Sequence, residues 1–141
     1  MSEIRRLAHV ERIPIRWGDM DAMGHVNNTV YFRYMEQARI SWFDRLVPEE
    51  DAWRSTGIVI ANASCNYRRA ITYPGTVEVK LYVGVPGGAS VPTYYELRVD
   101  ADPGPYADGA AVVVFIDMQT QKSRRIPDAI RARLERAEAA A

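Results

Sequence analysis

The chain has 141 residues, a length typical of one domain with a substantial core, and we expect residues 1–141 to form a single domain. Its 18 basic and 18 acidic side chains balance, whereas nucleic-acid-binding proteins usually carry a basic excess. The one cysteine, Cys65, excludes an intrachain disulfide and no apolar run is long enough to span a bilayer, so we expect a cytoplasmic protein that binds neither nucleic acid nor membrane.

The first predicted element is a strand over residues 9–17, where polar and apolar side chains alternate. Ile13, Ile15 and Trp17 should share one face of this strand. Pro14 cannot donate a hydrogen bond to a neighbouring strand, so the strand should lie at an edge of the sheet or begin late. The residues GDMDAMG that follow should form a loop.

The second predicted element is a long helix from about Asn28 to Leu46. Three consecutive residues, Asn27, Asn28 and Thr29, are suitable N-caps for it. Apolar residues recur at spacings of three and four and form a face wide enough for a helix that is covered on most sides. The residues of this face are Tyr31, Phe32, Met35, Ala38, Trp42, Phe43 and Leu46.

Four strand-like runs follow, over residues 57–69, 76–85, 92–101 and 110–120. The run 76–85 alternates cleanly between apolar and polar residues. The run 110–120 is the most apolar of the four and should therefore lie centrally in a sheet. A short exposed helix should begin at Pro127 or Asp128 and end the chain.

This order of elements predicts an α+β fold in which a five-stranded antiparallel sheet wraps around one long central helix. Such a layer pair leaves strand edges unpaired and one face of the sheet open. Apolar side chains such as Val112, Val114 and Ile116 would then need cover. We therefore expect a homodimer or a homotetramer.

The segment from Asp19 to Arg39, DMDAMGHVNNTVYFRYMEQAR, places acids, an imidazole and amides directly before the most apolar helix. It resembles the pattern D-x-D-x-x-G-H-x-N-N-x-x-Y-x-x-[YF]-x-E-x-A-R of hotdog-fold thioesterases of the 4-hydroxybenzoyl-CoA thioesterase type. The resemblance is strongest over residues 10–46 and continues as strand order to about residue 126. It implies the hotdog fold, hydrolysis of acyl thioesters of coenzyme A or acyl carrier protein, and an active site between two protomers.

By this resemblance the catalytic carboxylate is Asp21. In one related group a histidine stands seven residues after this aspartate, where this chain has Asn28. In the plant-type acyl-carrier-protein thioesterases an asparagine and a histidine stand two and four residues after it, where this chain has Met23 and His25. This chain therefore keeps the catalytic aspartate of the pattern. The resemblance does not specify which residue exchanges a proton with it.

Thioester hydrolysis needs a nucleophile or a base-activated water, and a donor for the developing oxyanion. Asp21 can serve as nucleophile or general base, and His25 can orient or assist it. The helix N-terminal amides near Asn28 can polarise the carbonyl. No cofactor is expected, because coenzyme A is part of the substrate. A metal site made of Asp19, Asp21 and His25 is disfavoured, because it lacks a second histidine.

Structural roles compete with functional ones for several of these residues. Asp19 is expected to form a turn, and Cys65 to pack in a strand. Glu36 should pair with Arg33 and Arg39 along the helix, or else line the pocket. Five basic residues are candidates for coenzyme A phosphates but equally suit a solvated surface: Arg68, Arg69, Lys122, Arg124 and Arg125.

The main hypothesis is an acyl-CoA thioesterase. An acyl-carrier-protein thioesterase, a non-catalytic hotdog module that binds acyl thioesters, and a hotdog dehydratase are the alternatives. The retained Asp21 favours an enzyme, because a carboxylate beside the thioester would not improve binding in a non-catalytic module. The sequence does not specify the acyl group or its chain length.

Overall fold

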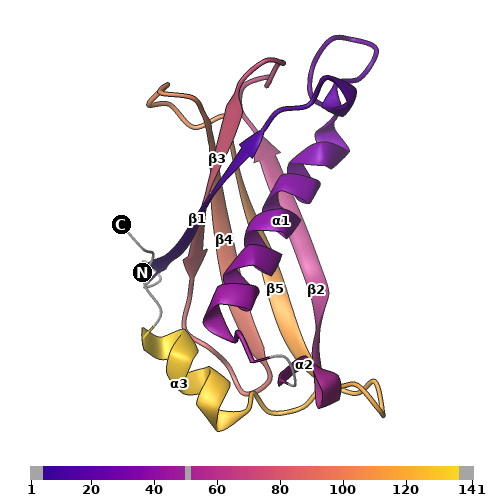
Figure 1. The fold of residues 1–141 in the computed structure, drawn as a ribbon, viewed down its shortest axis with the longest axis vertical. Helices are drawn as coiled ribbons and strands as arrows, with labels where there is room; N and C mark the ends of the chain where they lie inside the picture. The colour runs from indigo at the N-terminus through magenta and orange to yellow at the C-terminus, as the bar shows by residue number, and fades with distance from the viewer. Residues whose placement is uncertain (1–4, 50–51, 137–141) are drawn as a thin grey trace.

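A five-stranded antiparallel sheet lies against one long helix in the computed structural model, which describes residues 5–49 and 52–136 (Figure 1). The helix is α1 (Asn28–Leu46), with the predicted bounds. The strands are arranged in the order β1-β3-β4-β5-β2. Their bounds are β1 (Arg6–Pro14), β2 (Thr56–Tyr67), β3 (Thr76–Val83), β4 (Ser90–Val99) and β5 (Ala107–Asp117). The predicted hotdog-type α+β fold is confirmed.

The core forms between α1 and one face of the sheet. Apolar side chains recur every three or four residues along α1 and at every second residue along the strands, so each element has one apolar face. Every second residue of β3 and β4 is buried. Most of the predicted apolar face of α1 is buried on this side, whereas Arg33, Gln37 and Ile40 are exposed. The helix is therefore covered on its sheet side and open on the other.

The end of β1 differs from its prediction. The strand begins three residues earlier than expected and ends at Pro14, which pairs with Thr76. Ile15 then enters the core beyond the strand, and Trp17 is 73 % exposed in a short 3-10 helix, η1 (Trp17–Asp19). The prediction of a strand through Trp17 is wrong, because the chain turns after the proline. β1 does lie at an edge of the sheet, as expected.

The other edge is β2, which pairs only with β5 among the described strands. Its residues 59–64 are all exposed, including Val59 and Ile60. The most apolar strand, β5, lies inside the sheet between β4 and β2, but the middle position belongs to β4. The sheet therefore offers one long edge strand that carries apolar side chains.

Two short helices lie at the end of the molecule opposite the start of α1 (Figure 1). α2 (Ala52–Ser55) was not predicted. α3 (Asp128–Arg136) begins at Asp128 as predicted and inserts Ile130 and Leu134 into the core. The predicted continuation of this helix beyond residue 136 lies outside the described residues. No helix in the described ranges has the length and apolar character needed to cross a membrane.

Candidate functional site

The start of α1 is fixed by a side-chain cap. The Oδ1 atom of Asn27 accepts hydrogen bonds from the backbone N–H of Thr29 at 3.0 Å and from the Thr29 hydroxyl at 2.9 Å. Of the three predicted cap residues, Asn27 therefore is the N-cap and Asn28 is the first helical residue. At that position an α-helix provides no intrahelical acceptor for the backbone N–H. The helix start thus presents a donor at the positive end of its dipole.

The loop before the helix is a tight turn that holds Asp21 and His25 side by side. The backbone N–H of Asp21 donates to the carbonyl of His25 at 2.7 Å, and the N–H of Gly24 donates to the carbonyl of Asp21 at 3.0 Å. Gly24 has a φ of 78°, a left-handed conformation that glycine adopts without steric cost. The spacing D-x-x-G-H therefore has a structural reason: the turn closes only with a glycine before the histidine.

The two aspartates of the motif have different environments. Asp19 is 6 % exposed and accepts hydrogen bonds from the Tyr34 hydroxyl at 2.9 Å and the Arg16 backbone N–H at 3.0 Å. Burial opposes ionisation of this carboxyl, but these bonds and the Arg16 guanidinium together hold its pKa below the usual value. Asp19 therefore anchors the loop to α1 and points away from solvent.

Asp21 is exposed, and its Oδ1 atom accepts from the backbone N–H of Met23 at 2.9 Å. A longer contact of 3.4 Å joins the same oxygen to the backbone N–H of His25. The loop thus orients the carboxylate through one oxygen. Among the described residues, no group donates a hydrogen bond to the other oxygen.

A pocket of about 320 Å³ brings the three predicted site residues together. It is lined by Asp21, His25, Val26, Asn28, Tyr31, Tyr67, Arg68, Arg69 and Ala70. The end of β2 closes it, because the Tyr67 hydroxyl donates to the carbonyl of Asn28 at 2.9 Å. Tyr31 meets the edge of the Tyr67 ring with centroids 4.9 Å apart. The geometry therefore joins the loop, the helix start and the edge strand in one site.

The two tyrosines were not predicted as site residues. Burial, together with neighbouring Cys65, raises the pKa of Tyr67, and burial raises that of Tyr31. Both hydroxyls are therefore neutral donors at physiological pH. No short pattern around Tyr67 in the sequence marks it, because its partner Asn28 lies 39 residues away along the chain.

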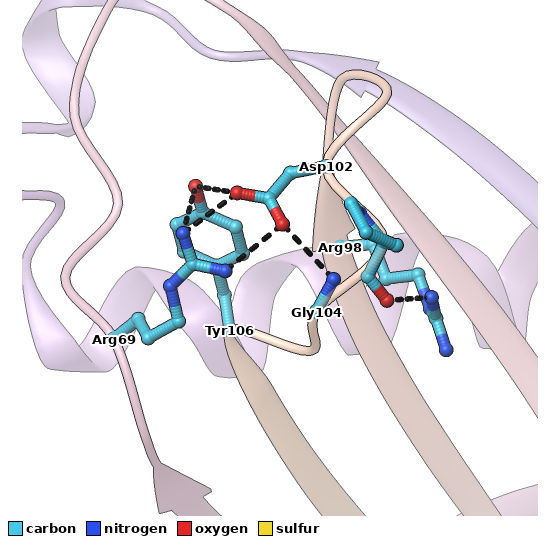
Figure 2. Close-up of polar contacts among 6 residues, drawn as sticks. Arg69, Arg98, Asp102, Gly104 and Tyr106 are labelled. Carbon is cyan, nitrogen blue, oxygen red and sulfur yellow. Dashed lines mark hydrogen bonds and ion pairs between the residues drawn. The ribbon is translucent and has the colours of Figure 1, made fainter.

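Both arginines of the pocket are engaged with carboxylates, and Figure 2 shows the pair that Arg69 makes. Arg69 forms a two-pronged pair with Asp102, with N–O distances of 3.0 and 2.6 Å, and also donates to the Tyr106 hydroxyl at 3.1 Å. The Arg69 guanidinium and the backbone N–H of Gly104 hold the pKa of Asp102 well below its usual range. Arg68 pairs with Asp108 through a single contact, from its Nε to Asp108 Oδ2 at 2.5 Å.

A second groove, of about 280 Å³, continues along the contact between α1 and β2. Its lining is Thr29, Phe32, Arg33, Met35, Glu36, Arg39, Ile60, Ala63, Ala110 and Ala111. Glu36 pairs with Arg33 at 3.0 Å, as one of its two predicted partners. Arg39 instead turns into the core and donates to the Tyr95 hydroxyl at 3.1 Å. The prediction of an Arg39–Glu36 pair is therefore wrong, because Arg39 points to the sheet and Glu36 to the surface.

Comparison with known proteins identifies the family to which this fold and this candidate site belong. Residues 15–134 match the family model of the thioesterase-like superfamily. The chain belongs to that superfamily. The prediction of a thioester hydrolase is confirmed at this level, and the family match spans the loop, α1 and every strand of the sheet except β1.

Three relatives of this thioesterase are informative. The PA2801 protein of Pseudomonas aeruginosa, a putative thioesterase, superposes with a TM-score of 0.83 at 39% identity, over 90% of this chain and 98% of that one. The long-chain acyl-CoA thioesterase FadM of Escherichia coli is 25% identical over 88% of this chain and 95% of its own. A Thermus thermophilus thioesterase crystallised with coenzyme A and zinc superposes with a TM-score of 0.78 at 29% identity, over 90% and 91% of the two chains.

Two further possibilities for the chemistry of this thioesterase are a cysteine nucleophile and a metal site. Cys65 is half-buried, and burial raises the pKa of its thiol, which disfavours a thiolate nucleophile. Within residues 5–49 and 52–136, no three His, Cys, Asp or Glu side chains are grouped so that they could hold a metal ion. Asp19 cannot join Asp21 and His25 in such a group, because it is bound to Tyr34 and Arg16.

Proposed function

We propose that this thioesterase hydrolyses acyl thioesters of coenzyme A, with Asp21 as nucleophile or general base. The observation that carries the proposal is the pocket that Asp21 and Asn28, the first residue of α1, line together. A carboxylate can attack or activate water, and a helix N-terminus can stabilise an oxyanion. These are the two groups that thioester hydrolysis needs.

In the nucleophilic route, a carboxylate oxygen of Asp21 attacks the thioester carbon, the C–S bond breaks and coenzyme A leaves as a thiolate. Water then hydrolyses the mixed anhydride and restores the carboxylate. In the general-base route, Asp21 takes a proton from a water molecule whose oxygen attacks the same carbon, and the C–S bond breaks as the tetrahedral intermediate collapses to the acid and the coenzyme A thiolate. In both routes the carbonyl oxygen points at the N–H of Asn28, and His25, which lines the same pocket, is the candidate donor of a proton to the departed thiolate.

The choice of coenzyme A over an acyl carrier protein is supported by two relatives. FadM is named as an acyl-CoA thioesterase, and the Thermus thermophilus relative was crystallised with coenzyme A. The groove along α1 and β2 is lined largely by Phe32, Met35, Ile60 and alanines, so it suits the acyl chain. Thr29, which lines this groove, follows Asn28 of the pocket in the first turn of α1.

The active form is proposed to be a dimer in which the β2 strands of two copies pair. β2 is an edge strand whose exposed residues 59–64 include Val59 and Ile60. An exposed edge with apolar side chains favours pairing with another strand. A two-fold axis through this edge would continue the sheet across both copies and would cover the groove beside β2.

The test is hydrolysis of a panel of acyl-CoAs by the wild-type protein and by Asp21→Asn, read as released thiol. Asn keeps the Oδ1 acceptor for the Met23 N–H, so the fold and KM should change little, while kcat should fall about a hundredfold or more. A non-catalytic acyl-thioester-binding module would instead bind acyl-CoA without releasing thiol. Wild-type turnover in Asp21→Asn would remove this carboxylate from the chemistry.

A further inference from the structure

The groove along α1 and β2 ends on a buried arginine. Arg39 is the last residue of α1 that lines this groove, and it is only 9% exposed. A guanidinium carries several N–H donors and stays charged at every physiological pH. Moving such a charge from water into a protein interior is unfavourable unless an anion or several hydrogen bonds compensate it. The partners of Arg39 therefore indicate what the groove can bind.

The partners of Arg39 are neutral. Its Nη1 atom donates to the Tyr95 hydroxyl at 3.1 Å, and among the described residues this guanidinium makes no other hydrogen bond and no ion pair. The other arginines that line the pocket or the groove, Arg33, Arg68 and Arg69, each pair with a carboxylate. The most buried of these four arginines thus keeps its full positive charge.

Two buried hydroxyl groups of β4 fix the orientation of this guanidinium. The hydroxyl oxygens of Thr93 and Tyr95 lie 2.6 Å apart. The Thr93 hydroxyl donates to the backbone carbonyl of Ala111 at 2.7 Å, so the proton between the two hydroxyls comes from Tyr95. The Tyr95 oxygen then accepts from Arg39. This chain of donors uses one nitrogen of Arg39 and leaves Nε and Nη2 for a ligand in the groove.

Pairing of β2 between two copies would not neutralise Arg39. The proposed dimer covers the groove beside β2, and residues 56–67 of this strand contain no aspartate or glutamate. Glu36 also lines the groove, but its carboxylate pairs with Arg33 at 3.0 Å. Closing the groove would therefore remove water from Arg39 without supplying a carboxylate from that strand. A ligand that carries its own anion would compensate the buried charge.

We propose that the groove selects acyl groups that end in a carboxylate, so that the substrate is a monothioester of a dicarboxylic acid with coenzyme A. The thioester lies at Asp21 and Asn28, the methylene chain along the apolar part of the groove, and the distal carboxylate at Arg39. A carboxylate matches the fork of a guanidinium with two parallel hydrogen bonds. The inference rests on the proposed function and specifies its acyl group. Hydrolysis consumes one water molecule and releases coenzyme A and a dicarboxylic acid.

The length of α1 sets the length of this acyl chain. Arg39 stands eleven positions after Asn28, a rise of about 16 Å along the helix axis. A helical side chain points back toward the N-terminus, so the guanidinium lies closer to Asn28 than this rise. C–C bonds of about 1.5 Å advance an extended chain by about 1.3 Å each. A chain of about ten carbons therefore reaches Arg39, whereas a chain of about six falls short.

The first experiment compares acyl-CoAs that differ only at the distal end of the acyl chain. Decanedioyl-CoA and decanoyl-CoA form the long pair, and hexanedioyl-CoA and hexanoyl-CoA form the short pair. For the wild type, kcat/KM from released thiol should be about tenfold or more higher for decanedioyl-CoA than for decanoyl-CoA, because a charge-assisted pair is gained. The short pair should show no preference for the carboxylate. Equal values within the long pair, or the same preference in both pairs, would overturn the proposal.

Arg39→Met is the matched variant, because methionine removes the charge and adapts well to irregular space in a core. Replacing a buried charge by an apolar side chain of similar volume is often neutral for stability. The ratio of kcat/KM between decanedioyl-CoA and decanoyl-CoA should fall to about one in this variant. An unaltered ratio in folded Arg39→Met would overturn the proposal.

The control is Arg12→Met, which removes the same charge from β1, at the edge of the sheet opposite β2. This variant should keep the wild-type ratio for the long pair. An equal loss of the ratio in Arg12→Met and Arg39→Met would overturn the proposal, because overall charge and not the end of the groove would then set the preference.

A binding measurement separates failure of this inference from failure of the proposed function. Asp21→Asn should bind acyl-CoA without rapid turnover, so calorimetry gives Kd for both members of the long pair. Kd should be about tenfold lower for decanedioyl-CoA, and Arg39→Met in the same background should abolish the difference. A wild-type protein that releases no thiol from any of these substrates would contradict the proposed function, whereas equal Kd values for the long pair would overturn the carboxylate site.

Discussion

Two residues apart in sequence, Asp19 and Asp21 perform different tasks because one is buried and the other exposed. Asp19 accepts hydrogen bonds from Tyr34 and Arg16 and connects the loop to the middle of α1. Asp21 is held through one oxygen, and the proposed chemistry would use the other. Changing the first should affect stability, and changing the second should affect turnover.

We expect Asp19→Asn to lower the free energy of unfolding most at neutral pH. The folded-state pKa of Asp19 lies below its usual value, so the ionised carboxylate stabilises the fold above the unfolded-state pKa of about 3.9. This contribution is lost as the pH falls through the folded-state value. Urea unfolding of the wild type and Asp19→Asn at several pH values should therefore give curves that converge below about pH 4.

Tyr34→Phe is the matched variant, because it removes the hydroxyl that donates to Asp19 and leaves the ring in the core. It should destabilise the fold over the same pH range by a smaller amount, since the bonds from Arg16 remain. A stability difference between wild type and Asp19→Asn that does not change with pH would contradict the ionised state of Asp19.

At the scale of elements, the capping residue at the start of α1 and the proposed oxyanion donor are different residues, Asn27 and Asn28. Asn27→Ala removes the N-cap and should cost about 1 kcal/mol of stability, measured by urea unfolding. Asn28→Pro should fold, because proline is favoured at the first helical position. It removes the proposed oxyanion donor, so kcat should fall about a hundredfold or more.

Asn28→Ala is the control for the side chain of that residue and should keep measurable turnover. If Asn28→Ala were as inactive as Asp21→Asn, the amide side chain would be the catalytic group instead of the backbone. Full kcat in a folded Asn28→Pro protein would show that the carbonyl is held elsewhere.

At Gly109, β5 lies close to α1 and to the backbone of β2. A Cβ atom there would lie 2.6 Å from the Met35 sulfur and 2.8 Å from the backbone carbonyl oxygen of Ser64. Gly109→Ala should therefore lower stability by about 1–3 kcal/mol through overpacking, because backbone cannot move aside as a side chain can. Gly88→Ala is the control, since no atom lies within 4 Å of its added Cβ, and thermal unfolding should detect the difference.

The elements that could be predicted from the sequence are those with a local cause. The bounds of α1 follow from polar caps and an apolar face in one segment, and Asp21, His25 and Asn28 share a single turn and helix start. The Tyr67 contact and the Arg69–Asp102 pair join segments 39 and 33 residues apart. Such contacts depend on strand order and register, which no short pattern encodes.

The inward turn of Arg39 has a similar explanation. In sequence it stands three residues from Glu36, a spacing that favours an ion pair on an exposed helix. In the folded chain the sheet lies under that face of α1, and the Tyr95 hydroxyl supplies a buried partner. Tertiary contact therefore outweighs the local pairing preference.

For the whole molecule, the exposed β2 edge predicts self-association. Val59 is 44% exposed on this strand, and a charge there should oppose strand pairing. Val59→Lys should therefore shift the protein from dimer toward monomer in light scattering at micromolar concentration. Val85→Lys is the matched control, because Val85 is 70% exposed beyond the end of β3 and should leave the mass unchanged. A monomeric wild-type protein would contradict the proposed dimer.

The hydrogen bond from Tyr67 to the carbonyl of Asn28 ties the association edge to the first residue of the catalytic helix. If two copies pair through β2 as proposed, assembly and substrate binding are thermodynamically linked, and the linkage is reciprocal. Dilution that separates the copies should lower the activity per molecule. A bound substrate analogue should in turn tighten the dimer by the same factor by which dimerisation tightens its binding. The concentration of the protein itself would thus set the fraction of chains that can catalyse.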